Sequence, residues 1–227
     1  MHKPLPHHSG HRNRIKERFL KSTKGSLSDL ELLELMLFWS IPRKDVKPIA
    51  NILMNSFGSI GGIVNASYNR LASTKEITKS TMTNILLLKE ILDRILHNNI
   101  MKQNILSSWS SLIDYLKVSM GGAKTEEFRI LFLNKKNILI ADEIQPYGTV
   151  DQTPIYPREV VKRALFHEAS ALILVHNHPS GNAAPSNSDI LVTKQIMEAC
   201  KTVSISIHDH VIVTSTEIYS FKSNLLL

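Results

Sequence analysis

The segment ALILVHNHPSGNAAPSNSD, residues 171–189, begins with an apolar run and ends with a polar pattern. The run ALILV, bounded by polar residues, is typical of a buried β-strand. Pro179 and Gly181 then predict a turn. Ser186 is a favoured N-cap residue, and Asp189 suits the positive end of a helix. The segment therefore predicts a strand, a loop and a helix in succession, as in an α/β fold.

Two histidines stand at the end of the predicted strand, His176 and His178. Side chains two residues apart on a strand point to the same face, so both imidazoles can reach one ion at about 2 Å. Asp189, brought back by the loop, could supply a third ligand. Three protein ligands and a water are typical of a catalytic zinc site. Bound Zn²⁺ brings the pKa of its water toward ~7.

Each part of this pattern also has a structural explanation. Two histidines one residue apart are often ordinary core or surface residues, and Ser186 with Asp189 is also a good helix start. Taken separately, the structural explanations are the commoner ones. The combined spacing, in which His-x-His is followed after seven residues by Ser and then by Asp, seldom arises by chance. The combination therefore favours a metal site.

The composition of the 227 residues limits the class of protein. This length is enough for one large domain or two small ones, and the 43% of apolar residues is enough for a packed core. Cys200 is the single cysteine, so neither an internal disulfide nor a thiolate zinc cluster can form, and we expect it in the core. No apolar run is long enough to span a membrane. We therefore expect a soluble cytoplasmic protein without membrane contact.

The positive charge is concentrated at the N-terminus. The formal net charge is +7, and residues 1–25 carry seven Lys/Arg and one acidic residue, a net +6. The remaining 202 residues carry twenty basic and nineteen acidic residues, a net +1. A basic arm is typical of contact with nucleic acid or another polyanion, and equally of a solubilising terminus. Both interpretations stay open.

The first hundred residues predict short helices. Ser28 and Glu31 form a capping-box pattern that opens an apolar helix, and Pro42 ends it. Further helical patterns cover residues 12–22, 45–57, 63–73 and 78–99.

The pattern changes after about residue 105 to alternating strands and helices. Strands are predicted at 126–134 and 137–144, joined as a hairpin, and at 170–175, 203–207 and 211–216. In this prediction His208, Asp209 and His210 lie between the last two strands. Helices are predicted at 157–169, where Pro157 is a favoured first residue, and at 186–201.

The sequence HNHPSGNAAPSNSD, residues 176–189, resembles the JAMM signature of JAB/MPN metallopeptidases in the form found in RadC proteins. Further matches to the RadC pattern are YPREVVKRALFHEASALILVHNHPSG (156–181), DHVIV (209–213), YSF (219–221), GHRNRIKERFL (10–20) and LSDLELLELMLF (27–38). The resemblance implies a basic arm (1–24), a helix-hairpin-helix-like domain (25–100) and a cytidine deaminase-like α/β domain of the JAB/MPN type (104–227).

The resemblance also implies roles for individual residues. His176, His178 and Asp189 would ligate Zn²⁺, and Ser186 would donate a hydrogen bond to an oxyanion. A glutamate at the start of the strand at 126–134 would act as general base and then as general acid. Glu126 is preferred over Glu127, which lies on the opposite strand face. Asp209 and His210 would support the sheet or the site rather than ligate the metal.

Two functions follow from the resemblance. The first is a zinc-dependent hydrolase of peptide or isopeptide bonds, acting on a peptide or protein substrate. The second is a DNA-associated repair or recombination protein whose zinc fold is an accessory. Helix-hairpin-helix turns bind DNA phosphates through glycine-rich backbone amides, and FGSIGGIVNAS at 57–67 is the nearest match. The second expected turn, EITKST at 76–81, has no glycine, and a purely structural helical domain is at least as well supported.

Overall fold

The computed structural model describes residues 7–227 except residues 24, 102 and 146–154. The chain forms two compact units, Met1–Ile91 and Leu92–Leu227. The division falls within the long helix α6, Lys79–Ile100. The predicted boundaries of the arm and of the two domains stay predictions, because one continuous helix contributes to both units.

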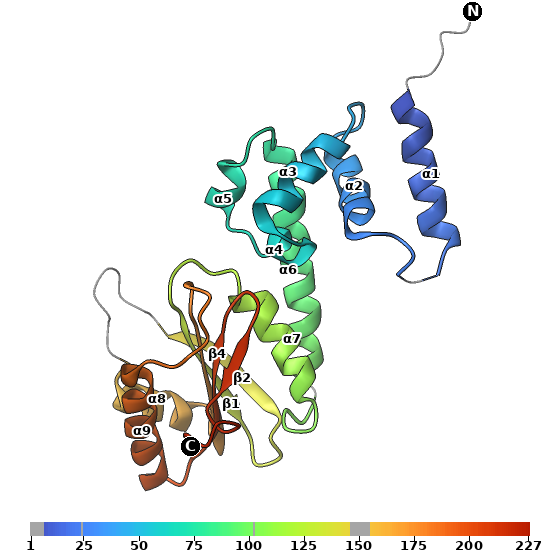
Figure 1. The fold of residues 1–227 in the computed structure, drawn as a ribbon. Helices are drawn as coiled ribbons and strands as arrows, with labels where there is room; N and C mark the ends of the chain where they lie inside the picture. Colours follow the sequence, from blue (N-terminus) through green and yellow to red (C-terminus); the bar gives the residue numbers. More distant parts are fainter. Residues whose placement is uncertain (1–6, 24, 102, 146–154) are drawn as a thin grey trace, which may run out of the picture. The chain divides into compact units, whose positions relative to one another are not determined.

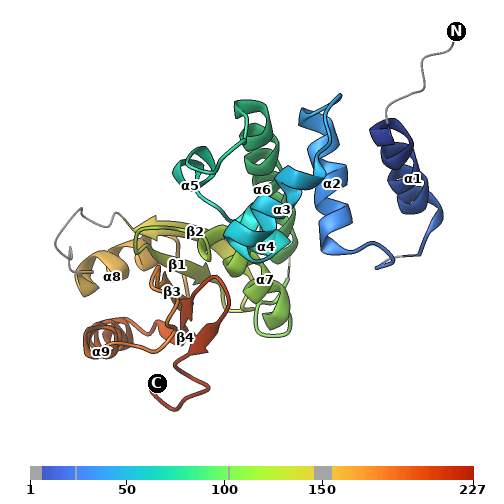
Figure 2. The same ribbon diagram turned by 45° about the horizontal axis from the view of Figure 1, so that its top comes forward.

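The described part of the first unit is helical, as the sequence predicts, but the helical pattern at 63–73 is divided between two short helices. Its helices are α1 (His7–Lys21), α2 (Asp29–Ser40), α3 (Lys47–Phe57), α4 (Ile60–Val64), α5 (Tyr68–Ala72) and the first part of α6. The predicted capping box is present, because Ser28 and Glu31 satisfy each other's backbone N–H groups at the start of α2. Apolar faces of the helices form one core around Leu37, Leu53 and Ile63. Figure 2 shows α1 alongside α2, both from this unit.

The second unit contains one five-stranded sheet with the order β2-β1-β3-β4-β5. The strands are β1 (Phe128–Leu133), β2 (Leu139–Gln145), β3 (Ala171–Asn177), β4 (Ser206–Val213) and β5 (Ile218–Ser220). Strands β3 and β4 pair in parallel, and the other neighbours pair antiparallel. The predicted hairpin is confirmed, since β1 and β2 pair across a short turn in which Asn137 has a φ of 58°.

Helices cover both faces of this sheet (Figure 1). Helices α8 (Pro157–Phe166) and α9 (Asn187–Thr202) lie on one face, and α7 (Trp109–Met120) lies on the other. The alternation along each strand explains the two layers. Leu172 and Leu174 of β3 belong to the core with α8 and α9, whereas Ile173 and Val175 belong to the core with α7. The mixed α/β fold class predicted from the sequence is confirmed.

The prediction of two separate strands at 203–207 and 211–216 was wrong. One strand, β4, runs from Ser206 to Val213 and includes the polar residues that were placed in a loop. Asp209 and His210 fit a buried strand because each has polar partners: Asp209 accepts hydrogen bonds from the Ser220 hydroxyl and the Lys222 backbone N–H. Helix α7 and strand β5 were not predicted. Among the described residues, no helix has the length and apolar character needed to cross a membrane.

Candidate metal centre

The two histidines of the site are held by the end of β3. His176 follows Leu172 and Leu174 on the face that α8 and α9 cover, and its side chain is buried. His178 lies just beyond the strand, where its backbone N–H donates to the Val213 carbonyl of β4 at 3.0 Å. The parallel pairing of β3 with β4 therefore continues past the strand end and fixes both histidines.

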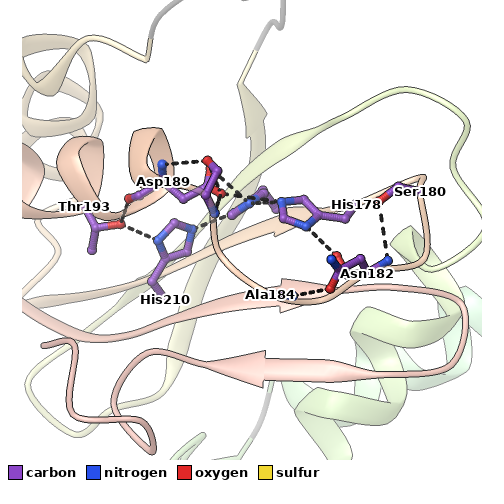
Figure 3. Close-up of polar contacts among 9 residues, drawn as sticks. His178, Ser180, Asn182, Ala184, Asp189, Thr193 and His210 are labelled. Carbon is purple, nitrogen blue, oxygen red and sulfur yellow. Dashed lines mark hydrogen bonds and ion pairs between the residues drawn. The ribbon is translucent and has the colours of Figure 1, made fainter.

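A tight loop returns the chain from His178 to α9. Gly181 has a φ of 85°, a conformation that glycine adopts without strain, and its N–H donates to the His178 carbonyl at 3.1 Å. The carbonyl of Asn182 lies 2.7 Å from His178 Nδ1 (Figure 3). Ser186 then caps α9, with Asp189 at the third helical position. The loop thus brings the first turn of α9 back to the histidines.

Candidate ligand atoms from His176, His178 and Asp189 converge between these elements. His176 Nε2 lies 2.9 Å from His178 Nε2 and 3.4 Å from Asp189 Oδ1, and His178 Nε2 lies 3.6 Å from Asp189 Oδ2. Two ligand atoms of a tetrahedral zinc ion, each bonded to the ion at about 2.0–2.1 Å, lie roughly 3.3 Å apart. The two nitrogen–oxygen distances lie near that value, and the nitrogen–nitrogen distance is shorter. With one such atom taken from each of the three residues, all lie within 4.8 Å of one another.

The chemistry of the donor set fits Zn²⁺. A backbone carbonyl only accepts hydrogen bonds, so neutral His178 carries its proton on Nδ1, facing Asn182, and presents a lone pair at Nε2. Burial raises the pKa of Asp189, but the hydrogen bond and charge of His176 in its protonated form, together with the hydrogen bonds of Ser186, outweigh it. The pKa of Asp189 is therefore held well below its usual range. Two imidazoles and one carboxylate are a ligand set that zinc favours in proteins.

A pocket of about 510 Å³ opens beside these residues. Its lining includes the three ligand candidates together with Glu126 and Ser186, so all five predicted site residues meet there. Phe128 pairs with His176 in the sheet, and Glu126 precedes Phe128 by two residues, which puts it on the same strand face. Glu127 does not line the pocket, and its backbone N–H donates to the Asn177 side chain at 2.7 Å.

Ser186 is engaged in the helix cap. Its hydroxyl donates to Asp189 Oδ2 at 2.7 Å and accepts from the Asp189 N–H at 3.2 Å. The predicted hydrogen bond to an oxyanion requires this hydroxyl to turn away from Asp189. The roles of Glu126 and Ser186 stay predictions, as do those of the three ligands.

Comparison with known proteins identifies the family. A sequence model of the RadC-like JAB domain matches residues 106–226, more than half of the chain. The chain belongs to the RadC-like JAB domain family. It is 46% identical over 213 residues to a UPF0758 protein of Ruegeria pomeroyi, an alignment that covers 94% of this chain and 95% of the relative. The resemblance drawn from the HNHPSG motif is thereby confirmed.

In this RadC-like protein a buried pair of residues lies behind His176. His210 Nε2 is 2.8 Å from His176 Nδ1, and His210 Nδ1 is 2.6 Å from the Thr193 hydroxyl (Figure 3). His210 is fully buried, and burial followed by the charge of His176 lowers its pKa well below the usual value. From the sequence, His210 was expected only to support the sheet or the site, and Thr193 was not predicted. Treating 203–216 as one strand parallel to β3 would have brought His210 beside His176.

Two other histidines of the second unit lie outside the RadC-like site. His167 is 2.6 Å from Glu143, and His208 is 2.7 Å from Asn137. Asp209 holds the C-terminal segment through Ser220 and the backbone of Lys222, away from the pocket.

The glycine-rich segment at 57–67 forms the turn between α3 and α4. Gly58 has a φ of 79°, and the N–H of Gly62 donates to the hydroxyl of Ser59 at 3.0 Å. A Cβ on Gly62 would lie 2.2 Å from the Phe57 carbonyl oxygen, so the close approach of the backbone explains this glycine. DNA binding by this turn stays a prediction.

Proposed function

We propose that this RadC-like JAB domain is a zinc-dependent hydrolase of amide bonds, either peptide or isopeptide, in a peptide or protein substrate. The observation that carries the proposal is the convergence of His176 Nε2, His178 Nε2 and the Asp189 carboxylate beside a pocket that Glu126 also lines. A carboxylate next to a ligand set with room for substrate is the arrangement that metal-assisted hydrolysis uses.

His176, His178 and Asp189 would hold the ion. Zn²⁺ bound there supplies Lewis acidity: it polarises a carbonyl and lowers the pKa of water to about 7. The anionic Asp189 offsets part of the charge of the ion, and the β3–β4 pairing keeps the two imidazoles aimed at one point.

Glu126 would move the proton. Its carboxylate takes a proton from the attacking water as the new carbon–oxygen bond forms, and then gives it to the amine nitrogen as the carbon–nitrogen bond breaks. The Ser186 hydroxyl, once turned from Asp189, would donate to the oxyanion between these steps. Glu126 is exposed on the pocket wall, so solvent and substrate both reach it.

Metal content tests the first part of the proposal. We expect the purified wild-type protein to bind close to one equivalent of zinc, measured by elemental analysis and by competition with a chromophoric chelator. His176→Ala and Asp189→Ala should each lose most of it, whereas His208→Ala, a histidine outside the pocket, should retain it. Zinc content that is low in the wild type, or unchanged in both ligand variants, would contradict the proposal.

Hydrolysis tests the second part. We expect the zinc-loaded protein to cleave members of a set of internally quenched peptides and isopeptides. Glu126→Gln should retain zinc and lose cleavage by about 10²-fold or more, as expected for loss of a general base. The neighbouring Glu127→Gln is the matched control and should retain cleavage. Equal losses in both variants would remove Glu126 from the proton-transfer role.

DNA association is the second candidate, and the exposed Arg14 and Lys16 of α1 favour it. The contacts that α1 makes within its own unit argue against this candidate. Arg12 donates to the carbonyl oxygens of Ile41 and Lys44, and Arg18 pairs with Glu31 at 2.5 Å, so two of the basic side chains already have partners.

Charge substitution tests the DNA candidate better than truncation, because Ile15 of α1 is buried in the core. If the candidate is right, binding of a fluorescent duplex should weaken steeply with salt, and Arg14→Gln/Lys16→Gln should flatten that salt dependence. Binding that is absent at low salt, or unchanged by the two substitutions, would reject it.

A further inference from the structure

We infer that His210 and Thr193 act as positioning residues that fix the proton of His176 on Nδ1 and so leave its Nε2 free to bind a cation. The inference rests on the proposed function for its consequence, zinc binding. The arrangement of hydrogen bonds carries it independently of any metal.

The backbone carbonyl of Asp189 can only accept hydrogen bonds. The Thr193 hydroxyl donates its single proton to the backbone carbonyl of Asp189 at 2.5 Å. The same oxygen lies 2.6 Å from His210 Nδ1 and must therefore accept a hydrogen bond there. His210 accordingly carries its proton on Nδ1.

His210 in turn determines which ring nitrogen of His176 carries the proton. Neutral His210 with a proton on Nδ1 has only a lone pair on Nε2, and that atom lies 2.8 Å from His176 Nδ1. His176 Nδ1 must then donate, so neutral His176 presents a lone pair at Nε2. That nitrogen is the one facing His178 and Asp189.

The two histidine ligands are thus oriented by equivalent devices. His178 donates from Nδ1 to the carbonyl of Asn182, and His176 donates from Nδ1 into a relay that ends on the carbonyl of Asp189. In both cases a backbone carbonyl oxygen at the end of the series of hydrogen bonds determines which ring nitrogen carries no proton. The relay to Asp189 also ties β3 and β4 to the residue that supplies the carboxylate ligand.

Packing protects the relay from competing hydrogen bonds. His210 is fully buried, and Thr193 is 1% exposed. The His210 ring stacks on Phe221 with centroids 4.6 Å apart and meets the edge of Phe128 at 5.7 Å. A 180° flip of the ring would replace both nitrogens with carbons at these positions and so lose the two hydrogen bonds.

The tautomers can be measured directly. Long-range ¹H–¹⁵N spectra of zinc-free wild-type protein, at a pH well above the usual histidine pKa of about 6.5, should show His176 and His210 protonated on Nδ1. Thr193→Val keeps the shape of the side chain but removes the hydroxyl, and it should shift His210 and His176 toward mixed tautomers. Thr193→Ser keeps the hydroxyl and should resemble the wild type. Protonation of His176 on Nε2 in the wild type would overturn the inference.

Zinc affinity gives the second readout. Loss of a hydrogen-bond partner of a metal ligand lowers affinity by roughly 10–100-fold, so His210→Ala should weaken zinc binding to that extent. Thr193→Val, which acts through His210, should also weaken it. Thr193→Ser should not, and His210→Gln should recover part of the loss because its side-chain oxygen can accept from His176 Nδ1. Equal zinc affinity of the Val and Ser variants would also overturn the inference. A wild type that binds no zinc contradicts the proposed function, and the tautomers then decide the inference alone.

Discussion

The Asp189 Oδ2 atom accepts two hydrogen bonds from Ser186, one from its backbone N–H and one from its hydroxyl, each at 2.7 Å. The other carboxylate oxygen, Oδ1, lies 3.4 Å from His176 Nε2. One side chain therefore completes the capping box of α9 and faces the histidines. The start of the helix orients the candidate ligand, so we expect stability and metal binding to be coupled at this residue.

Replacement of the cap should show this coupling. Ser186→Ala removes the hydroxyl that bonds Asp189, and we expect a loss of about 1 kcal/mol in the free energy of unfolding, as for other N-caps. It should also weaken zinc binding, since the carboxylate loses one of the hydrogen bonds that orient it. Ser186→Thr keeps the hydroxyl and is the control. Urea unfolding and chelator competition measure both effects, and identical results for the two variants would show that the cap does not orient Asp189.

The local parts of the site could be predicted from the sequence. The capping box and the return of Asp189 depend on residues within one strand, one loop and one helix start, where spacing determines geometry. His176 and His178 follow from the two-residue period of a strand. The same holds for the capping box of α2, whose partners Ser28 and Glu31 are three residues apart.

The parts that depend on distant residues could not be predicted. His210 contacts His176 across 34 positions of the chain, and Thr193 contacts His210 across 17. Asp209 and His210 interrupt the apolar pattern of β4, and only their partners in the folded chain make them compatible with a buried strand. The same applies to Arg129, a charged residue on an otherwise apolar strand, β1, whose partner comes from β2.

Acid should destabilise the second unit partly through Glu143. Hydrogen bonds from Arg163, and then from His167, lower the pKa of Glu143 to about 2 against the opposing effect of burial. An unfolded glutamate titrates near 4.3, so the stabilising contribution is complete above that pH and is lost as the pH falls toward 2. Glu143→Gln should therefore reduce stability at neutral pH and flatten its dependence on acid pH. Glu198→Gln, at an exposed position of α9, is the control for urea unfolding across this pH range. Parallel pH profiles for Glu143→Gln and the wild type would reject the role.

The thiol of Cys200 should be inert in the folded protein. The residue is fully buried in α9, and burial raises its pKa to about 11, so the thiolate is scarce at neutral pH. We expect iodoacetamide to modify it only after denaturation, as followed by mass spectrometry. Lys201→Cys adds a thiol at the next, exposed position of the same helix and should react quickly under native conditions. Modification of both thiols at similar native rates would show that the helix opens readily.

Removing one partner of the Arg129–Asp142 ion pair should lower the free energy of unfolding strongly. Removing both partners together should lower it much less. Arg129 Nη1 donates to Asp142 Oδ2 at 2.9 Å, the two side chains are 8% and 6% exposed, and the Tyr115 hydroxyl donates to the same carboxylate at 2.5 Å. Arg129→Met or Asp142→Leu alone leaves a buried charge without its partner, and each should lower the free energy of unfolding by about 3–5 kcal/mol. The double variant removes both charges, so its stability should lie much closer to that of the wild type. Urea unfolding of the four proteins forms a double-mutant cycle, and a double variant that loses the sum of the single losses would show that the pair is not coupled.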